Sequence, residues 1–246
     1  LIEWGRTDSG GLYLVMELAA GRSLLDDLKG PVPVRRALEI VRQVLLALDH
    51  AHRAGVIHRD VKPENVMVSE TKRGLPLVKV LDFGFCRLLD DQEPDRRLTG
   101  GYVMGTPTYM APELLQGADA DERSDLYGVG AMLFYLLTGR KPFEGSGPLE
   151  ILRNKAHGDA PALGAVAPGV FCSRLEAIVD TVLRREPHQR YASARQFAEA
   201  IVAVQREPGG GLATEERSTP APGRGRGLGR VISACRQLLT AAGVAS

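Results

Sequence analysis

The sequence predicts an α+β fold in which a few short strands accompany a mainly helical region. Apolar residues recur every three or four positions between 34 and 54, which is the spacing of one helix face. The stretch 126–137 is apolar on all sides, as expected of a buried helix. Strand-like runs rich in apolar residues lie at 1–4, 12–16, 66–68 and 77–81 and supply the β part of the prediction.

The composition is that of a globular protein with a hydrophobic core, since 44% of the 246 residues are hydrophobic and 25% are charged. The net charge of +1 gives no global field that would recruit nucleic acid or a membrane surface. Three widely separated cysteines match neither a disulfide framework nor a metal spacing. No apolar run reaches the roughly 18 residues of a membrane helix. We therefore expect a cytoplasmic protein with no membrane segment and no nucleic-acid partner.

The first elements of the chain have clear boundary signals. Residues 1–18 predict two strands around a Gly-rich turn at 8–11. Pro33 suits the start of the following helix and Gly55 its end. The apolar stripe of this helix consists of Val34, Leu38, Val41, Leu45 and Leu48. The helix leads directly into a polar loop.

The later elements are predicted to be helices. Ser124 opens the apolar helix 126–137 and Gly139 closes it, and a shorter helix follows near 149–157. The strings SRLE at 173–176 and SARQ at 193–196 have the pattern of capping boxes, so a helix should begin at each. From about 207 the composition shifts to Gly, Pro, Arg and Thr. This change predicts a linker or tail over 207–246, with a short helix at 231–242.

The polar loop at 58–65, with the sequence HRDVKPEN, carries the residues that point to a reaction. Asp60 can accept a proton from a hydroxyl, Lys62 can neutralise a transferring phosphate, and Asn65 can hold a metal ion. Asp82 follows the strand-like run 77–81 and is well placed for a second magnesium site. These residue types at these spacings indicate phosphoryl transfer.

Three strings in this order resemble the protein kinase signature set: HRDVKPEN at 58–65, DFG at 82–84 and GTPTYMAPE at 105–113. With Lys62 two residues after the Asp, the chain is most similar to bacterial serine/threonine kinases of the eukaryotic (Hanks) type. The resemblance implies a protein kinase-like fold over 1–206. Residues 1–18 would be a remnant of the β-rich N-terminal lobe with the hinge, and residues 19–206 would form a mainly helical C-terminal lobe.

The resemblance also implies the chemistry and the partners. ATP would be the co-substrate, Mg²⁺ the cofactor, and Ser or Thr hydroxyls of proteins the acceptors, with signalling, autophosphorylation and a dimer for phosphorylation in trans. Asp60 would be the base, aided by Lys62, Asn65 and Thr106, while Asn65 and Asp82 would hold the metal. The residues expected to bind the nucleotide are Met16, Glu17, Ala19, Glu64, Met67 and Leu81.

The long polar segment 82–113 is similar to a kinase activation segment, because compact domains rarely keep so long a loop unless it is functional. Arg59 has no acidic neighbour in its loop, so a phosphorylated Thr could supply the anion that a buried guanidinium needs. By position Thr99 is the preferred site and Thr108 the second.

Three structural contacts follow from the same resemblance. Asp125 should anchor the backbone of the catalytic loop. Glu113 should pair with Arg190 and pin the activation segment to the lower lobe. His58 should pack under Phe83 and not act as a base.

The Gly-rich loop, the nucleotide-binding lysine and its acidic partner precede this stretch in the family, and no residue here occupies their positions. We therefore expect an N-terminally incomplete kinase, with Lys79 a solvated strand residue. A catalytically impaired fragment or pseudokinase-like scaffold is the alternative, although Asp60, Asn65 and Asp82 are all intact. A small-molecule kinase of the aminoglycoside type is a third reading, against which Lys62 and the Ala-Pro-Glu segment speak.

Overall fold

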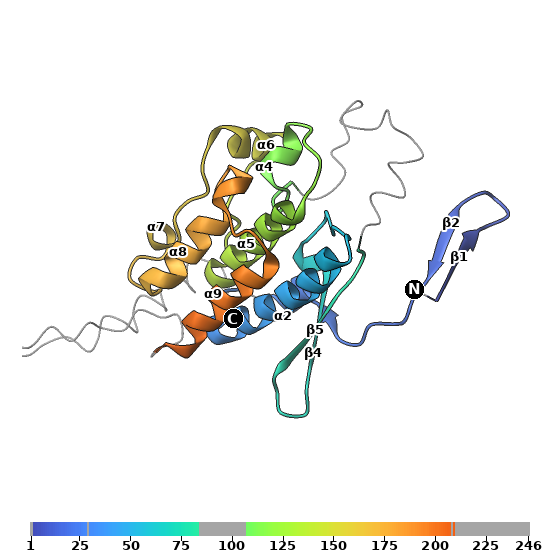
Figure 1. The fold of residues 1–246 in the computed structure, drawn as a ribbon, viewed down its shortest axis with the longest axis horizontal. Coiled ribbons are helices and arrows are strands. Elements are labelled where there is room, and N and C mark those ends of the chain that lie inside the picture. Colours follow the sequence, from blue (N-terminus) through green and yellow to red (C-terminus); the bar gives the residue numbers. More distant parts are fainter. Residues whose placement is uncertain (1, 29, 84–106, 208, 210–246) are drawn as a thin grey trace, which may run out of the picture. The chain divides into compact units, whose positions relative to one another are not determined.

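The computed structural model describes residues 2–28, 30–83, 107–207 and 209 (Figure 1). The chain divides into two units, Leu1–Thr214 and Glu215–Ser246, and the second unit lies outside the described residues together with the helix predicted at 231–242. The described part contains both strands and helices, so the α+β prediction is confirmed. None of its helices is long and apolar enough to cross a membrane.

The predicted strands and helices occur in the predicted order, and the structure adds the short elements β3, α1, α4 and α7. The strands are β1 (Glu3–Arg6), β2 (Leu12–Val15), β3 (Arg22–Ser23), β4 (Val66–Glu70) and β5 (Pro76–Val80). The helices are α1 (Leu24–Asp27), α2 (Val34–Arg53), α4 (Pro112–Leu115), α5 (Glu122–Thr138), α6 (Pro148–His157), α7 (Leu163–Val166), α8 (Ser173–Val182) and α9 (Ala194–Arg206). Two 3₁₀ turns, η1 (Pro63–Asn65) and η3 (Pro187–Gln189), complete the set.

The strands form two small antiparallel sheets. The predicted hairpin is confirmed as β1 paired with β2, in register from Glu3 opposite Val15. The second sheet has the order β3-β4-β5. Its outer strand is covered by a side chain of α2: the Gln43 amide donates to Pro76 O (2.9 Å) and accepts from Val78 N (3.0 Å). This amide satisfies backbone groups that would otherwise form an open sheet edge.

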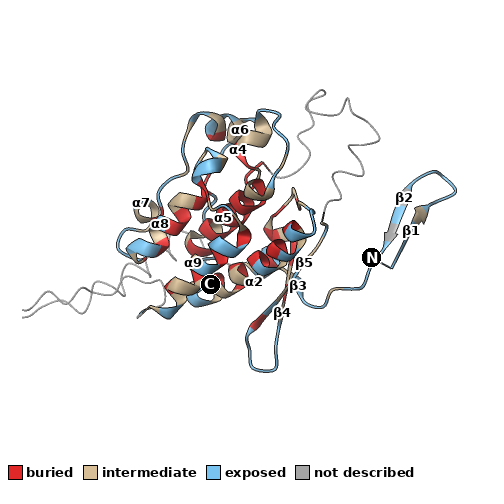
Figure 2. Ribbon diagram, viewed as in Figure 1, coloured by how far each residue is buried: buried red, intermediate tan, exposed pale blue. Residues whose placement is uncertain are grey.

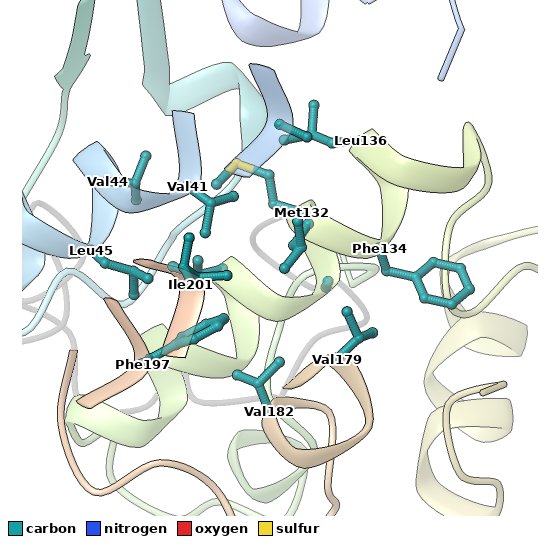
Figure 3. Packing of buried hydrophobic residues seen from close by; sticks show 14 of the residues in the cluster. Val41, Val44, Leu45, Met132, Phe134, Leu136, Val179, Val182, Phe197 and Ile201 are labelled. Atoms are coloured by element: carbon teal, nitrogen blue, oxygen red, sulfur yellow. The ribbon is translucent and has the colours of Figure 1, made fainter. Parts of the chain in front are cut away.

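Helix α5 is the centre of the core and packs against α2 and α8, while α9 packs against α2 and α8 (Figures 1 and 2). It begins at Glu122, two residues earlier than predicted, because Asp121 and Ser124 cap each other's backbone N–H groups. It ends as predicted at Gly139, which is left-handed with φ 69°. Figure 3 shows the packing of Val41, Val44 and Leu45 from α2, Met132, Phe134 and Leu136 from α5, Val179 and Val182 from α8, and Phe197 and Ile201 from α9.

The two predicted capping boxes have different outcomes. Ser193 caps α9 by accepting from Gln196 N at 3.2 Å, and the Gln196 side chain accepts from Ala192 N at 2.7 Å. The prediction for Ser173 is wrong: Cys172 takes the extended N-cap conformation, and Ser173 is the first residue of α8. A hydroxyl inside the first turn cannot act as the N-cap.

Candidate active site

The polar loop after α2 is anchored from below by one buried carboxylate, that of Asp125 on α5. Asp125 Oδ2 accepts from His58 N (2.8 Å) and Oδ1 accepts from Arg59 N (2.7 Å). His52 Nε2 forms a further 2.7 Å hydrogen bond with Oδ2. Arg59 has φ 71°, a conformation that costs a non-glycine residue energy and that these bonds stabilise. The predicted anchor is therefore confirmed, with His52 as a structural partner that the sequence did not reveal.

A glycine of α5 allows the loop to lie this close to the core helix. A Cβ on Gly128 would be 2.9 Å from Val61 O and 3.5 Å from Tyr109 O. The first distance is shorter than real Cβ contacts allow, so any larger residue would push the loop away. Gly128 therefore allows the polar loop 58–65 and the segment around Tyr109 to lie close to α5.

Three of the predicted site residues converge within this loop. Lys62 Nζ donates to Asp60 Oδ2 at 2.5 Å. Asn65 Nδ2 donates to Asp60 O (2.8 Å) and to Oδ2 (3.1 Å). Among the described residues nothing donates to Asp60 Oδ1, so this oxygen is left to accept a proton. The amide oxygen of Asn65 remains available for a metal, because its nitrogen is already used.

Asp82 is brought beside this loop by the backbone. Leu81 N donates to Asn65 O at 2.8 Å, which joins the end of β5 to η1. Asp82 follows with a left-handed φ of 61° and an exposed side chain. Carboxylate and amide oxygens are suitable ligands for Mg²⁺, so the donor set of Asn65 and Asp82 fits this ion. Within the described ranges no group of three or more His, Cys, Asp or Glu residues forms another metal site.

The contact between His58 and Phe83 is confirmed. The ring centroids are 4.7 Å apart, with the planes tilted by 49° and not parallel. His58 is fully buried, which is consistent with packing. The contact fixes the residue that follows Asp82.

The residues expected to bind the nucleotide lie on β4, on β5 and on the stretch after β2. Met67 and Leu81 are half-buried, Ala19 is half-buried, and Met16 and Glu17 are exposed. Lys79 is exposed as predicted but not merely solvated, because its Nζ donates to Glu17 Oε1 at 2.7 Å. This ion pair lowers the pKa of Glu17 and joins the stretch after β2 to β5.

Glu64 is half-buried, and one oxygen of its carboxylate has a distinctive environment. Its Oε2 is buried and has no hydrogen-bond partner among the described residues. The pKa of Tyr109 is raised, chiefly by burial and further by the charge of Glu64. A buried, unpaired carboxylate oxygen is suited to a donor from a ligand or a substrate.

Glu113 and Arg190 form the predicted pair. Arg190 Nη1 and Nη2 donate to the two Glu113 oxygens, each at 2.7 Å. The other three donors go to the carbonyls of Arg184 (2.7 Å), Arg123 (3.1 Å) and Arg185 (2.6 Å), so all five N–H groups are used. Burial raises the pKa of Glu113, but Arg190 outweighs burial and the net pKa is lowered.

Of the three threonines that the sequence analysis singles out in the segment 82–113, the structure describes only Thr108. Thr99 and Thr106 lie outside the described residues. Thr108 is fully buried, and its hydroxyl has no hydrogen-bond partner among the described residues. Thr108 is therefore wrong as a phosphorylation site in this conformation, because an attacking enzyme cannot reach its oxygen.

Lys155 on α6 was not among the residues predicted for the site, but it is 1% exposed and donates to three backbone carbonyls of the segment 107–110. One signal was present: Lys155 lies four residues after Ile151 and three after Leu152, on the apolar side of the predicted helix. A lysine at such a position is buried when a cluster of acceptors faces it.

The family model for the protein kinase domain matches residues 3–202 of this chain. Among curated relatives, the serine/threonine-protein kinase pkn3 of Myxococcus xanthus is 39% identical over 211 residues, which are 84% of this chain and 39% of pkn3. The serine/threonine-protein kinase PknL of Mycobacterium tuberculosis is 37% identical over 212 residues, which are 85% of this chain and 50% of PknL. The chain thus spans half or less of the length of these two relatives.

Two solved structures are also similar to this chain in fold and sequence. The kinase domain of PknI from Mycobacterium tuberculosis has a TM-score of 0.61 and 29% identity, covering 82% of this chain and 69% of that chain. The structure of Rad53 1–466 in complex with AMP-PNP has a TM-score of 0.62 and 27% identity, covering 81% of this chain and 48% of that chain.

Proposed function

The chain belongs to the protein kinase domain family, and from this premise we propose that it is a serine/threonine protein kinase. It transfers the γ-phosphate of ATP to Ser or Thr hydroxyls of proteins. The observation that carries the proposal is the arrangement around Asp60. Its carboxylate accepts hydrogen bonds from Lys62 and Asn65. Asp125 holds the backbone of the same loop by accepting from Arg59 N. The cytoplasmic location and the dimer expected from the sequence remain predictions.

The proposed roles follow from the atoms that remain free. Asp60 Oδ1 accepts the proton of the incoming hydroxyl, and Lys62 supplies positive charge near the transferring phosphate. Lys62 also forms an ion pair with Asp60 at 2.5 Å, which holds the carboxylate of Asp60 in place. Thr106 is proposed to bond to Asp60 and help admit the substrate, as the family resemblance implies.

Protein kinases generally use ATP with Mg²⁺. We assign the ion to the amide oxygen of Asn65 and the carboxylate of Asp82, whose backbones are joined through Leu81. When bound, Mg²⁺ neutralises the charge of the phosphate oxygens. The nucleotide base is assigned to the stretch containing Met16, Glu17 and Ala19. The AMP-PNP in the Rad53 complex supports a nucleotide ligand here.

Protein acceptors are supported by the relatives that are described as serine/threonine-protein kinases. They are also supported by the Glu113–Arg190 pair, which holds the end of the activation segment in place beside the catalytic loop. A small-molecule kinase has no need of such a platform for a peptide.

The test is ATP-dependent phosphorylation of a generic acceptor protein and of the chain itself. It is run with the 246-residue chain and with the same chain preceded by the Gly-rich strands and lysine-bearing strand of a protein kinase. Asp60→Asn should reduce the rate about a hundredfold or more, the contribution of a general base. Asp119→Asn, an exposed control of the same chemistry, should leave the rate unchanged.

Equal rates for the wild type and Asp60→Asn would refute the proposed role of Asp60. Magnesium-dependent ATP binding without phosphorylation, in both forms of the chain, would instead favour the scaffold alternative.

A further inference from the structure

We propose that Lys155 is a positioning residue whose ammonium group holds the segment 107–110 against α6 and thereby sets the wall of the pocket beside Asp60. The consequence for substrates rests on the proposed function, because this pocket lies where a protein acceptor would approach the catalytic loop. The holding of the segment itself does not depend on catalysis and can be measured separately.

The geometry at the amine carries the inference. Lys155 Nζ donates to Pro107 O (2.8 Å), Thr108 O (2.8 Å) and Met110 O (2.6 Å). A protonated amine has three N–H donors, so each is used, and all three go to one four-residue stretch. These carbonyls belong to a segment outside any helix or strand, where buried backbone groups need partners from elsewhere. One side chain supplies all three.

The surroundings of the amine explain how a buried charge is tolerated. The rings of Tyr127 and Phe143 lie 5.1 and 5.4 Å from Nζ, at distances where an aromatic face attracts a cation. Burial lowers the pKa of Lys155 to about 7, while the charge of Glu113 raises it and that of Arg190 lowers it. The carbonyl oxygens and the aromatic rings therefore provide the solvation that water would otherwise give.

The held segment reaches the catalytic loop directly. A pocket of about 20 Å³ lies between the two, lined by Arg59, Asp60 and Val61 on one side, by Tyr109, Met110, Ala111 and Leu114 on another, and by Ser124, Asp125 and Gly128 of α5. This volume holds about one water molecule. Because the Met110 carbonyl is one of the three that Lys155 binds, a rotation of that peptide would move the pocket wall.

A lysine that only stabilises the fold would donate to the same three carbonyls. The experiment therefore has to separate a role in stability alone from a role in positioning the segment for the substrate. The variants are Lys155→Met, which keeps the length and removes the donors, and Lys155→Arg, which keeps charge and donors. The matched control is Asn154→Ala on the same helix. Asn154 also donates from its side chain to a backbone carbonyl, but to that of Glu144 at 2.9 Å.

The first measurement is deuterium uptake of the 246-residue chain, read from peptides covering 107–115. We expect Lys155→Met to exchange there about tenfold faster or more, since buried carbonyls lose their donors. Exchange in α2 should stay the same. Asn154→Ala should match the wild type, and Lys155→Arg should lie between the wild type and Lys155→Met. Unchanged exchange in Lys155→Met would overturn the proposal.

The second measurement is the kinetics with a peptide acceptor. We expect Lys155→Met to raise the KM for the peptide about tenfold, with the KM for ATP and the kcat changed less than twofold, and Lys155→Arg to restore part of the loss. Faster exchange with an unchanged peptide KM would leave Lys155 a structural residue and overturn its positioning role.

Two further outcomes are informative. If the wild-type chain phosphorylates nothing, the proposed function fails, and deuterium uptake alone decides whether Lys155 holds the segment. If Lys155→Met does not fold, the comparison of Lys155→Arg with Asn154→Ala decides: faster exchange at 107–115 in Lys155→Arg alone supports the clamp, and equal exchange in both overturns it.

Discussion

Removal of the Arg190 guanidinium should be among the most destabilising single changes in the described part of the chain. The Arg190 side chain is 0% exposed and that of Glu113 only 13% exposed. Arg190→Met leaves the Glu113 carboxylate without its bidentate partner and the carbonyls of Arg123, Arg184 and Arg185 without donors. Breaking a buried ion pair by removing one partner costs about 3–5 kcal/mol, and we expect a loss in this range.

The assay is urea unfolding of the wild type and the variant, followed by far-UV circular dichroism. Arg190→Lys should recover only part of the loss, because a lysine has three donors and cannot form the planar pair with Glu113. Arg195→Met is the matched control: Arg195 is 59% exposed and lies 3.3 Å from Asp49. It should cost less than about 1 kcal/mol, because Arg195 is solvent-exposed and Asp49 keeps its ion pair with Arg53 at 2.6 Å.

The double variant Arg190→Met with Glu113→Gln completes a cycle. It should be less destabilised than the sum of the two single variants, since the buried charge is gone. A loss below about 1 kcal/mol for Arg190→Met, equal to that of the exposed control, would refute the reasoning.

Three other perturbations have defined outcomes. Asp125→Asn replaces one carboxylate oxygen by an NH2 group, which cannot accept from the amide of His58 or Arg59 that it faces, and should lower kcat about a hundredfold with a smaller change in KM, measured by steady-state phosphorylation. Because the folded-state pKa of Glu113 lies below its ordinary value of 4.5, the folded state binds fewer protons just below that pH. The stability from this group is present above about pH 4.5 and lost as the pH falls through the folded-state pKa, and urea midpoints between pH 3 and 6 should show a smaller slope in Glu113→Gln. Asp82→Asn should raise the Mg²⁺ concentration needed for half-maximal ATP binding about tenfold or more, measured by calorimetric titration at fixed chain concentration, and an unchanged requirement would exclude Asp82 as a ligand.

The sequence by itself determined the family and the order of the longer elements, but not the short elements β3, α1, α4 and α7. The three strings at 58–65, 82–84 and 105–113 suffice for the protein kinase resemblance, and the family model confirms it. The mainly helical fold is likewise confirmed by the solved kinase structures that the chain resembles. Helix α2 was predictable because its stripe, its Pro33 start and its Gly55 end are all local signals.

Local signals also have limits, which the helix starts illustrate. Both Ser173 and Ser193 have the residue pattern of a cap, but only Ser193 has the extended backbone that lets its hydroxyl reach the third amide. The pattern names residue types, whereas the cap depends on where the chain turns, and neighbouring elements decide that turn.

Only the tertiary structure decided which polar side chains serve the site from a distance. His52 and Asp125 are 73 residues apart, and Lys155 and Pro107 are 48 residues apart. Periodicity reports which face of a helix is apolar, but not which backbone carbonyls will lie opposite that face. Lys155 can be buried because α6 packs beside the segment 107–110, where three backbone carbonyls accept from its ammonium group. These carbonyls lie next to one another only in the folded chain.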